Sequence, residues 1–393
     1  MDDVVIIGGG IIGAASAYFL SKEGRKVKVI ERDPTYKKAS FPLSLGGFRR
    51  QFFQKENILL GKFAREFIFQ IPELLKTKKN PKPTASVVPN GYLFLFGPEH
   101  APEQYEALKN HKQCEAGTKN IKGSELKKKF PYVNDEGIET VTYTDDKKEG
   151  WIDPMSLLNG LKRKARQLGV TYLAGEVTGL RQNNSSIQGV KLRDGGEIKS
   201  RWVVNAAGPR AAEIAAMADI ELPIDPQRLV TYVFDCQSPV AHAPLTADIS
   251  DVVVRPEGTG FLALMSPKAN ENPWTFDFDI DYALFEESVW PILAHRFPVF
   301  ESIKLRTAWA GHLAYNHFDR NAIIGVYPGV DGFLLANGFS GHGLQHSPAT
   351  GRALMELIVY GDYQTLDLSR LSVDRVLNNE PIEELLVPGA TTP

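Results

Sequence analysis

Four consecutive branched apolar residues, 4–7, are typical of a strand that is buried on both faces. Glycines follow at positions 8, 10 and 13, and an apolar stretch over 14–23 predicts a helix that ends at Gly24. Residues 26–30 predict a second strand, which ends at Glu31. The pattern therefore predicts a strand, a glycine-rich turn, a helix and a second strand within the first 31 residues.

The glycine spacing is typical of a turn that binds a pyrophosphate. Gly8 allows the tight turn, Gly10 allows close approach of the phosphates, and Gly13 allows the helix to pack closely on the strand. The free N–H groups and the dipole at the helix N-terminus favour an anion there. The Glu31 carboxylate can accept hydrogen bonds from a ribose. These residues together predict a dinucleotide site.

Later segments of the chain predict further helices and strands. Residues 154–168 predict a helix with Asp153 as N-cap and Pro154 in the first turn. Strands are predicted over 92–96, 170–174, 177–180, 188–192, 197–200 and 202–209. The last of these is buried and ends in small residues, which suit a cofactor pressed against the backbone. Residues 222–300 predict mostly alternating strands, including 230–236 and 275–280, and we expect a sheet that covers the cofactor.

A second glycine-rich loop lies near the end of the chain. Residues 322–326 and 333–336 predict strands, and residues 337–345 form the loop. The helix that follows is predicted to run through Tyr360 and to stop at Gly361. The loop can therefore aim N–H groups at an anionic or carbonyl-bearing ring.

Composition excludes several classes of function. The net charge of −2 gives no global reason to expect nucleic acid as a partner. Cys114 and Cys236 are the only cysteines, so no cysteine metal motif is expected. No apolar run approaches the ~20 residues of a membrane span. Because the nucleotide strand begins at residue 4, we expect no targeting segment and a cytoplasmic protein.

Two adjacent arginines are the first candidates for binding a substrate. Arg49 and Arg50 follow the paired glycines 46 and 47, which predict a close backbone approach to a ligand. Their planar guanidinium groups suit a phosphate or a carboxylate. The alternative is an arginine pair on the surface.

The chain resembles the FAD-dependent amine oxidoreductases of the D-amino-acid oxidase superfamily, in the group of sarcosine oxidase, glycine oxidase and dimethylglycine dehydrogenase. The similar motifs are residues 4–13 with Glu31, 150–154, 203–209, 309–311 leading to Asp319 and 323–325, and 338–343. The resemblance implies an α/β (α+β) fold, with a Rossmann-like FAD-binding domain and a discontinuous, mainly antiparallel substrate domain. The expected FAD-binding domain is 1–85, 145–215 and 310–393, and the expected substrate domain is 86–144 and 216–309.

The resemblance also implies which residues hold FAD. The ADP half is expected to contact Gly8, Gly10, Ile11, Ile12, Gly13, Glu31, Arg32 and, through its backbone, Val177, with Ala207 and Gly208 beside the pyrophosphate. The flavin is expected to contact Ser44, Leu45, Gly46, Gly47, Gly338, Gly341, His342, Gly343, Leu344 and Gln345. Neutral Gln345 stands where sarcosine oxidase-type members carry a lysine, so the charge of the reduced flavin is less stabilised there.

The implied reaction moves hydride from an amine carbon to flavin N5 and leaves an imine that water hydrolyses. A substrate carboxylate requires a cation, for which Arg49 or Arg50 is expected, and then His312. His312 lies near the position of a carboxylate-binding arginine in glycine oxidase-like members; the alternative is a packed, hydrogen-bonded histidine. Tyr315 is a further catalytic candidate, and no metal is expected.

Three departures from the family bear on the chemistry. Relatives attach flavin through a cysteine near the position of Gly311 or through a histidine in the segment that corresponds to 40–47. This chain has neither residue there, so we expect noncovalent FAD. The segment 261–264 lacks the lysine that activates oxygen in sarcosine oxidase, although Lys268 can substitute. Without a cation near the flavin, superoxide formation is disfavoured. We therefore expect a dehydrogenase that passes electrons to an acceptor protein or a quinone.

Two alternatives remain. Residues 310–313, 338–345 and 364–368 are also similar to a flavoprotein that acts in the assembly of respiratory complex I, so FAD could mainly support the fold of an assembly or scaffolding protein. A nicotinamide-dependent dehydrogenase fits only the first 31 residues and leaves the loop at 338–343 unexplained.

Overall fold

The computed structural model describes residues 2–183, 185–237, 240, 242–265 and 274–385. Its first sheet is built around β1 (Asp2–Ile7), in which Val4 to Ile7 are buried. β1 pairs in parallel with β2 (Val27–Glu31) and β12 (Glu197–Asn205), as expected for a strand buried on both faces. The other strands of this sheet are β9 (Thr171–Ala174), β10 (Val177–Asn183), β11 (Ser186–Leu192), β18 (Ile323–Val326) and β19 (Phe333–Asn337).

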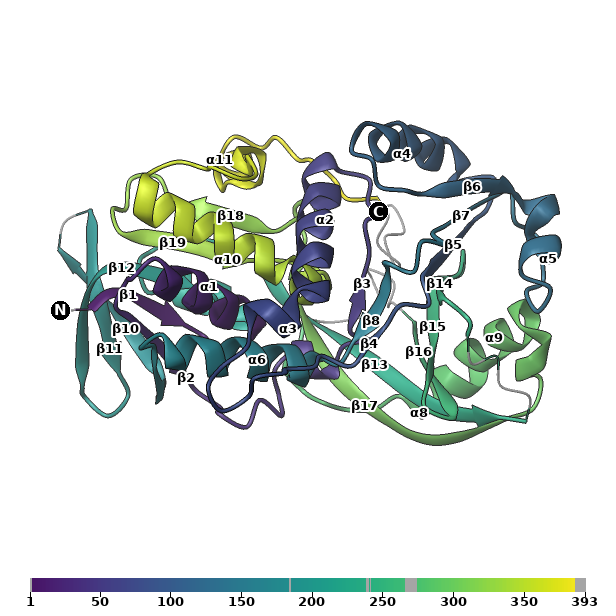
Figure 1. Cartoon of the computed structure of the whole chain (residues 1–393), viewed down its shortest axis with the longest axis horizontal. Coiled ribbons are helices and arrows are strands. Elements are labelled where there is room, and N and C mark those ends of the chain that lie inside the picture. Colours follow the sequence, from purple (N-terminus) through teal and green to yellow (C-terminus); the bar gives the residue numbers. More distant parts are fainter. Residues whose placement is uncertain (1, 184, 238–239, 241, 266–273, 386–393) are drawn as a thin grey trace.

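Three helices pack against the first sheet and against one another. α1 (Ile11–Lys22) is buried from Ile11 to Ser21, and it contacts both α6 (Pro154–Gln167) and α10 (Gly343–Tyr360). Figure 1 shows these helices together beside the sheet. A Cβ on Gly351 of α10 would lie 2.6 Å from the backbone of Ala15, so the two helices are closer than a side chain would allow.

The second sheet is antiparallel except where β14 and β5 pair in parallel. The long strands β13 (Ile224–Cys236) and β17 (Ile303–Asn316) form one edge and curve along the molecule in Figure 1. The remaining strands, in order, are β16 (Gly260–Met265), β15 (Val252–Glu257), β14 (Leu245–Ala247), β5 (Tyr92–Phe96), β7 (Thr140–Tyr143) and β6 (Lys119–Lys122). The fold is therefore mixed α/β; the division into a cofactor domain and a substrate domain stays a prediction.

A small sheet joins segments that the sequence separates widely. β8 (Gly150–Ile152) lies between β3 (Gly47–Phe48) and β4 (Val87–Val88). The longer helices outside the first sheet are α2 (Lys55–Phe69) and α4 (Ala101–Gln113). The short helices are α3 (Ile71–Leu74), α5 (Leu126–Lys129), α7 (Ala211–Ala216), α8 (Tyr282–Leu284), α9 (Trp290–Arg296) and α11 (Asp374–Leu377).

The strand expected over 275–280 is wrong, because this segment forms no strand. The Thr275 hydroxyl accepts the N–H of Asp277, and the Asp277 carboxylate accepts the N–H of Asp279. Such short-range side-chain bonds compete with a strand ladder for the backbone. The helix α10, in contrast, runs through Tyr360 and ends at Gly361 with φ of 80°, as expected.

Candidate functional site

Three glycine-containing turns lie at one edge of the first sheet. They follow β1, β12 and β19, which are neighbouring parallel strands. Because the carboxyl ends of parallel strands lie on the same edge, the turns at Gly8, at 206–208 and at Gly338 come together. In open α/β sheets this edge is where ligands bind.

The first turn requires glycine at two positions. Gly8 has φ of 98°, and a Cβ there would overlap the carbonyl of Ala206. A Cβ on Gly13 would overlap the carbonyl oxygen of Gly8. The predicted roles of these glycines in turn geometry and helix packing are therefore visible in the backbone.

Gly10 differs, because space lies beside it. A Cβ on Gly10 would meet only the Phe41 ring, at 3.9 Å. Gly10 is also the N-cap of α1, which has no side-chain cap, so the first N–H groups of this helix face outward. An uncapped helix N-terminus with open space beside a glycine suits a phosphate.

Glu31, at the end of β2, is held by two backbone groups. Its carboxylate accepts the N–H of Gly9 at 2.8 Å and the N–H of Asp33 at 2.7 Å. Burial raises the pKa of the Glu31 carboxyl, while these hydrogen bonds act in the opposite direction. Each oxygen retains acceptor capacity, so this carboxylate can still bind the hydroxyl groups of a ribose. Arg32 beside it is exposed.

The remaining residues predicted for the ADP half surround this turn. Ile11 and Ile12 begin α1 and are buried, and Val177 begins β10 and is buried. Ala207 and Gly208 follow β12, and a Cβ on Gly208 would have nothing within 4 Å. The predicted residues that follow β1, β2 and β12 therefore lie at one edge of the first sheet, and the N–H of Gly175, two residues before Val177, donates to the Glu31 carbonyl.

The loop at 44–47 is held by three separate elements. The N–H of Ile152 in β8 donates to the Gly46 carbonyl at 2.9 Å. The indole of Trp309 in β17 donates to the Leu43 carbonyl at 3.0 Å, and the guanidinium of Arg255 in β15 donates to the Leu45 carbonyl at 2.8 Å. A loop anchored from two sheets can present its backbone to a ligand in one conformation.

The second glycine-rich loop contains a residue in an unusual conformation. Ser340 is buried and has φ of 46°, a region that non-glycine residues rarely adopt. Its hydroxyl accepts the N–H of Asn316 at 2.9 Å, and its own N–H donates to the Ala314 carbonyl. Gly338 and Gly341 in the same loop have φ of 71° and 96°. Gly343 and Leu344, also predicted to contact flavin, begin α10.

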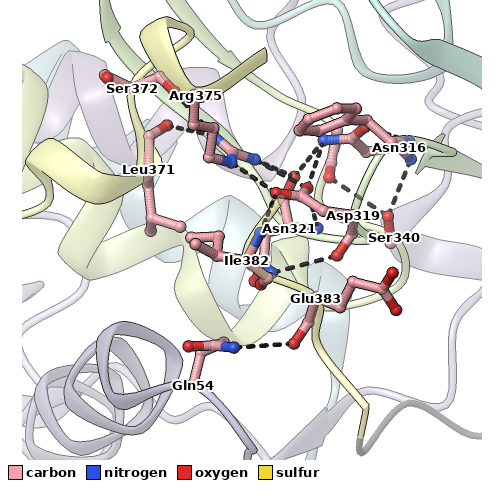
Figure 2. Close-up of polar contacts among 12 residues, drawn as sticks. Gln54, Asn316, Asp319, Asn321, Ser340, Leu371, Ser372, Arg375, Ile382 and Glu383 are labelled. Atoms are coloured by element: carbon pink, nitrogen blue, oxygen red, sulfur yellow. Dashed lines mark hydrogen bonds and ion pairs between the residues drawn. The ribbon is translucent and has the colours of Figure 1, made fainter. Parts of the chain in front are cut away.

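A buried polar network contacts this loop through Asn316 and Ser340, as Figure 2 shows. Asp319 accepts two bonds from the Arg375 guanidinium, at 2.6 and 3.0 Å, and one from the Asn316 side chain. Its other carboxylate contacts include the N–H groups of Asn321 and Ile382. The network therefore ties the C-terminal segment to the residue that holds Ser340.

The C-terminal segment also reaches the start of α2. The fully buried Glu384 carboxylate accepts the N–H groups of Phe53 and Gln54, at 2.7 and 3.1 Å. It also accepts the side chain of Asn57 at 2.8 Å. Glu384 therefore fixes the backbone just after the predicted arginine pair.

Arg49 joins the two loops. Its side chain is 4% exposed, and its N–H donates to the Gln345 side-chain oxygen at 2.7 Å. The guanidinium donates to the Gln51 carbonyl and to Nε2 of His342 at 3.2 Å. Its central carbon lies 3.9 Å from the ring centre of Phe52. The guanidinium therefore lies between the segment after β3 and the start of α10.

The Arg49 contact defines the protonation of His342. Because an arginine N–H can only donate, Nε2 of His342 accepts and the ring proton lies on Nδ1. Burial, followed by the charge of Arg49, lowers the pKa of His342 well below its usual value. His342 is thus neutral near pH 7, and Arg49 supplies the positive charge of this cluster.

Two further buried histidines contact Phe52. The ring of His346 lies 5.0 Å from the Phe52 ring, and His111 bonds the Phe52 carbonyl at 2.8 Å. Burial lowers the pKa of His346 to about 3 and that of His111 to about 4. The sequence contained no pattern that brought these histidines to Arg49.

These two histidines predict a loss of stability in mild acid. Their folded pKa values lie below the unfolded value, so the unfolded state binds more protons and stability falls as pH drops below about 6.5. By pH 5 each is expected to cost about 2 kcal/mol of unfolding free energy. Urea unfolding of the full-length protein at pH 7 and pH 5 measures this loss. His346→Gln is expected to remove about 2 kcal/mol of the loss, and His100→Gln, at the surface, is the control. An equal pH slope in all three proteins would contradict the prediction.

Arg50 lies in a different environment from Arg49. Its side chain pairs with the fully buried Glu149 at 2.9 Å and with Asp146 at 2.9 Å. The Glu149 carboxylate also accepts the Arg50 N–H and the Thr144 hydroxyl. The Arg50 guanidinium is therefore held by this network, away from His342, whereas Arg49 faces it.

His312 and Tyr315 lie on β17 beneath the segment at 274–278. Nε2 of His312 bonds the Asp277 carbonyl at 2.6 Å, and the ring packs against Phe278 at 4.5 Å. Burial lowers the pKa of His312, and the geometry matches a packed, hydrogen-bonded histidine. Tyr315 is stacked by Trp274 at 5.6 Å. The structure does not bring either residue to Arg49 by any contact among those it describes.

The described residues also bear on metal binding and on membrane spans. In the described part of the chain, no group of three or more metal-ligating side chains occurs. Among the same residues, no helix has the length and apolar character needed to cross a membrane. Lys268, the predicted substitute for an oxygen-activating lysine, lies outside the described residues.

Sequence reasoning missed one buried cation near the 44–47 loop. Arg255 in β15 is paired with Leu262 in β16. Leu262 belongs to the segment 261–264, in which no lysine occurs. A charged residue directly after the apolar run 252–254, inside a predicted strand region, was the available signal, because such a position is costly without polar partners.

Comparison with known proteins gives a consistent family match. The model of the DAO family, described as FAD dependent oxidoreductase, matches residues 3–357. The chain is 39% identical to FAD-dependent oxidoreductase domain-containing protein 1 of Xenopus laevis, covering 97% of this chain and 84% of that protein. It is 24% identical to mitochondrial sarcosine dehydrogenase of Homo sapiens, covering 91% of this chain and 40% of that protein.

Solved structures agree with the sequence comparison. The chain is similar to L-proline dehydrogenase from P. horikoshii, with a TM-score of 0.85 and 26% identity over 97% of this chain and 99% of that chain. Glycine oxidase from Geobacillus kaustophilus has the same fold, with a TM-score of 0.80 and 21% identity over 94% of this chain and 98% of that one. The resemblance drawn from the sequence motifs is confirmed at the level of the family.

Proposed function

Because this chain belongs to the DAO family of FAD-dependent oxidoreductases, we propose that it oxidises the C–N bond of a small amine or amino acid. The observation that supports this function is the buried Arg49 guanidinium, which lies between two glycine-rich loops beside neutral His342. FAD, when bound, supplies the acceptor for the hydride that leaves the carbon next to the amine nitrogen, with the electron pair of its C–H bond. The other steps depend on how this chain binds and orients the two molecules.

The residues present fit FAD. The uncapped N-terminus of α1 with open space at Gly10 suits the pyrophosphate, and Glu31 suits the ribose. We assign the flavin contacts to the backbone of residues 44–47 and of the loop at 338–345. Both cysteines lie outside these segments, since Cys114 follows α4 and Cys236 ends β13.

We therefore propose that FAD binds without a covalent bond to the protein. Acid precipitation of the purified protein is expected to leave a colourless pellet and yellow supernatant. A yellow pellet would show a covalent bond to FAD and would overturn this assignment.

Arg49 is proposed to bind the substrate carboxylate. The guanidinium lies against the rings of Phe52 and Phe94 and beside neutral His342, and the carboxylates of Glu149 and Glu384 also act on its charge. In this buried setting water screens the attraction for a further anion only weakly. The amine must be neutral to donate hydride, and a desolvated site favours its neutral form. These features together favour an amine with one carboxylate, such as an amino acid or an N-methyl amino acid.

The first experiment is anaerobic bleaching of the flavin band at about 450 nm. Sarcosine, dimethylglycine, glycine, proline and D-amino acids are added in turn to the FAD-loaded protein. Bleaching by one of them supports amine oxidation, and readmitted air then separates an oxidase from a dehydrogenase that needs an acceptor protein or a quinone. The absence of bleaching by all of them, in protein that dithionite still reduces, would count against turnover of these amines.

Substitution of Arg49 tests its role. Arg49→Gln is expected to lower the rate constant of flavin reduction divided by the substrate dissociation constant about 100-fold, because the carboxylate loses its charged partner. The dissociation constant of FAD is expected to change less than about threefold, since no ADP-half contact is lost. Arg193→Gln is the control, because Arg193 pairs with Glu176 on the surface. If Arg49→Gln reduces the flavin at the wild-type rate, another group binds the substrate.

An assembly or scaffolding role is the second candidate. Relatives at 32–39% identity are named for their domain, whereas the sarcosine and dimethylglycine dehydrogenases of Homo sapiens share 24%. The bleaching series distinguishes the two, together with a pull-down that tests whether respiratory subunits remain bound. Retained subunits without turnover would favour the assembly role.

A further inference from the structure

Arg255 is a buried arginine at a position where the sheet pattern calls for an apolar side chain. It lies on β15 after three buried valines and is 6% exposed. The cost of burying a guanidinium is high unless it finds polar partners. Its partners therefore indicate what it does.

The side chain points toward the loop at 44–47. Nε donates to the Leu45 carbonyl at 2.8 Å, and the guanidinium carbon lies 5.1 Å from the Trp151 ring centre. Trp151 is itself paired with Gly47 in the small sheet. Arg255 thus contacts both the loop and the strand that supports it, from a sheet to which neither belongs.

The charge of Arg255 is incompletely neutralised. Nη1 donates to its neighbour's carbonyl, that of Pro256, at 2.8 Å, and it also contacts Glu257. The Glu257 side chain is 51% exposed, so water screens its charge more than that of the buried guanidinium. An arginine stays protonated in proteins, so a positive charge persists behind the loop.

We propose that Arg255 is a positioning residue of the cofactor site, whose charge also favours the reduced form of a flavin bound at the 44–47 loop. The inference rests on the proposed function, because it takes the loop to contact the flavin. Reduction adds two electrons and one proton to the neutral flavin ring, so the ring gains one negative charge. A fixed positive charge nearby stabilises that product over the oxidised form.

The test compares midpoint potentials of bound FAD, measured against reference dyes with dithionite as reductant. Arg255→Gln is expected to shift the reduction equilibrium about tenfold toward oxidised FAD, which is a fall of about 30 mV for a two-electron couple. Arg255→Lys keeps the charge and is expected to stay within about threefold of wild type. Glu257→Gln removes the opposing charge and is expected to shift the equilibrium about twofold the other way.

The opposite signs separate an electrostatic role from a structural one. A potential in Arg255→Gln equal to wild type would overturn the proposal, as would an equal fall in Arg255→Lys. If Arg255→Gln does not fold, Glu257→Gln decides, and a potential that does not rise overturns the proposal. Hydrogen exchange at residues 44–47, measured in protein without FAD, is expected to be faster in Arg255→Gln, because the Leu45 carbonyl loses its partner.

The same experiment distinguishes this inference from the proposed function. If the wild-type protein does not bind FAD at all, the proposed function fails and the inference with it. If wild type binds FAD and no variant shifts its potential, only the inference fails. Neither result requires that an amine substrate be known.

Discussion

A Gly10→Ala variant is expected to fold normally and to bind FAD at least about 100-fold more weakly than wild type, a loss of about 2.7 kcal/mol. Gly10 has φ of −64°, which alanine adopts without strain. The added Cβ meets only the Phe41 ring, at an ordinary 3.9 Å. Within the protein itself, therefore, the substitution costs almost nothing.

The effect on FAD has a separate cause. The methyl group projects into the space beside the uncapped N-terminus of α1, where we place the pyrophosphate. It holds the phosphates away from the backbone N–H groups that bind them. Titration of the apoprotein with FAD measures affinity, and urea unfolding of the same apoprotein measures stability.

Gly24→Ala provides the opposite control. Gly24 has φ of 75°, and a Cβ there would have nothing within 4 Å. This variant is expected to lose about 1 kcal/mol of stability through backbone strain and to keep its FAD affinity. If Gly10→Ala binds FAD as tightly as wild type does, the pyrophosphate does not lie at this turn. Equal losses of affinity and stability in Gly10→Ala would instead show a folding defect.

Asp319→Asn is expected to lower the free energy of unfolding by about 3 kcal/mol. Asp319 is 1% exposed and accepts two hydrogen bonds from Arg375, which is itself buried. An asparagine of the same size turns an amide N–H₂ toward those donors and leaves the guanidinium without its counter-charge. Removing one partner of a buried ion pair costs more than the pair contributes.

The loss is expected to reach the site through the network in Figure 2. The Ile382 N–H donates to the Asp319 carboxylate, the Glu384 N–H donates to the Asp319 backbone carbonyl, and the Glu384 side chain holds the backbone before α2. Hydrogen exchange should therefore rise over 378–385 and at Phe53 and Gln54, while urea midpoints give the change in stability.

Glu176→Gln is the matched control for Asp319→Asn. Glu176 forms two hydrogen bonds with Arg193, at 2.7 and 2.9 Å, but this pair lies at the surface. Its loss is expected to cost less than about 1 kcal/mol, because water screens the charges. Similar small losses in both variants would show that the Asp319 network does not stabilise the fold.

The local sequence pattern was sufficient to predict the glycine-rich turn after β1. Gly8, Gly13 and Glu31 could be assigned because the turn, its helix and its two strands are consecutive in sequence, and each glycine answers a local steric demand. The same is true of the helix that ends at Gly361, where a left-handed residue terminates it. The strand expected over 275–280 failed because short-range side-chain bonds, which periodicity does not reveal, took its place.

The sequence by itself determined the strand, turn and helix that begin with β1, because these follow from local spacing, and its separated motifs were enough to recognise the family and with it the fold. Only the tertiary structure showed that Arg49 and Arg50, although adjacent, have different partners, His342 and Glu149. It also placed Arg255 behind the 44–47 loop, from a strand about 200 residues later. Such contacts depend on which buried groups find hydrogen-bonding partners after distant segments pack, and no pattern along one stretch of chain contains that information.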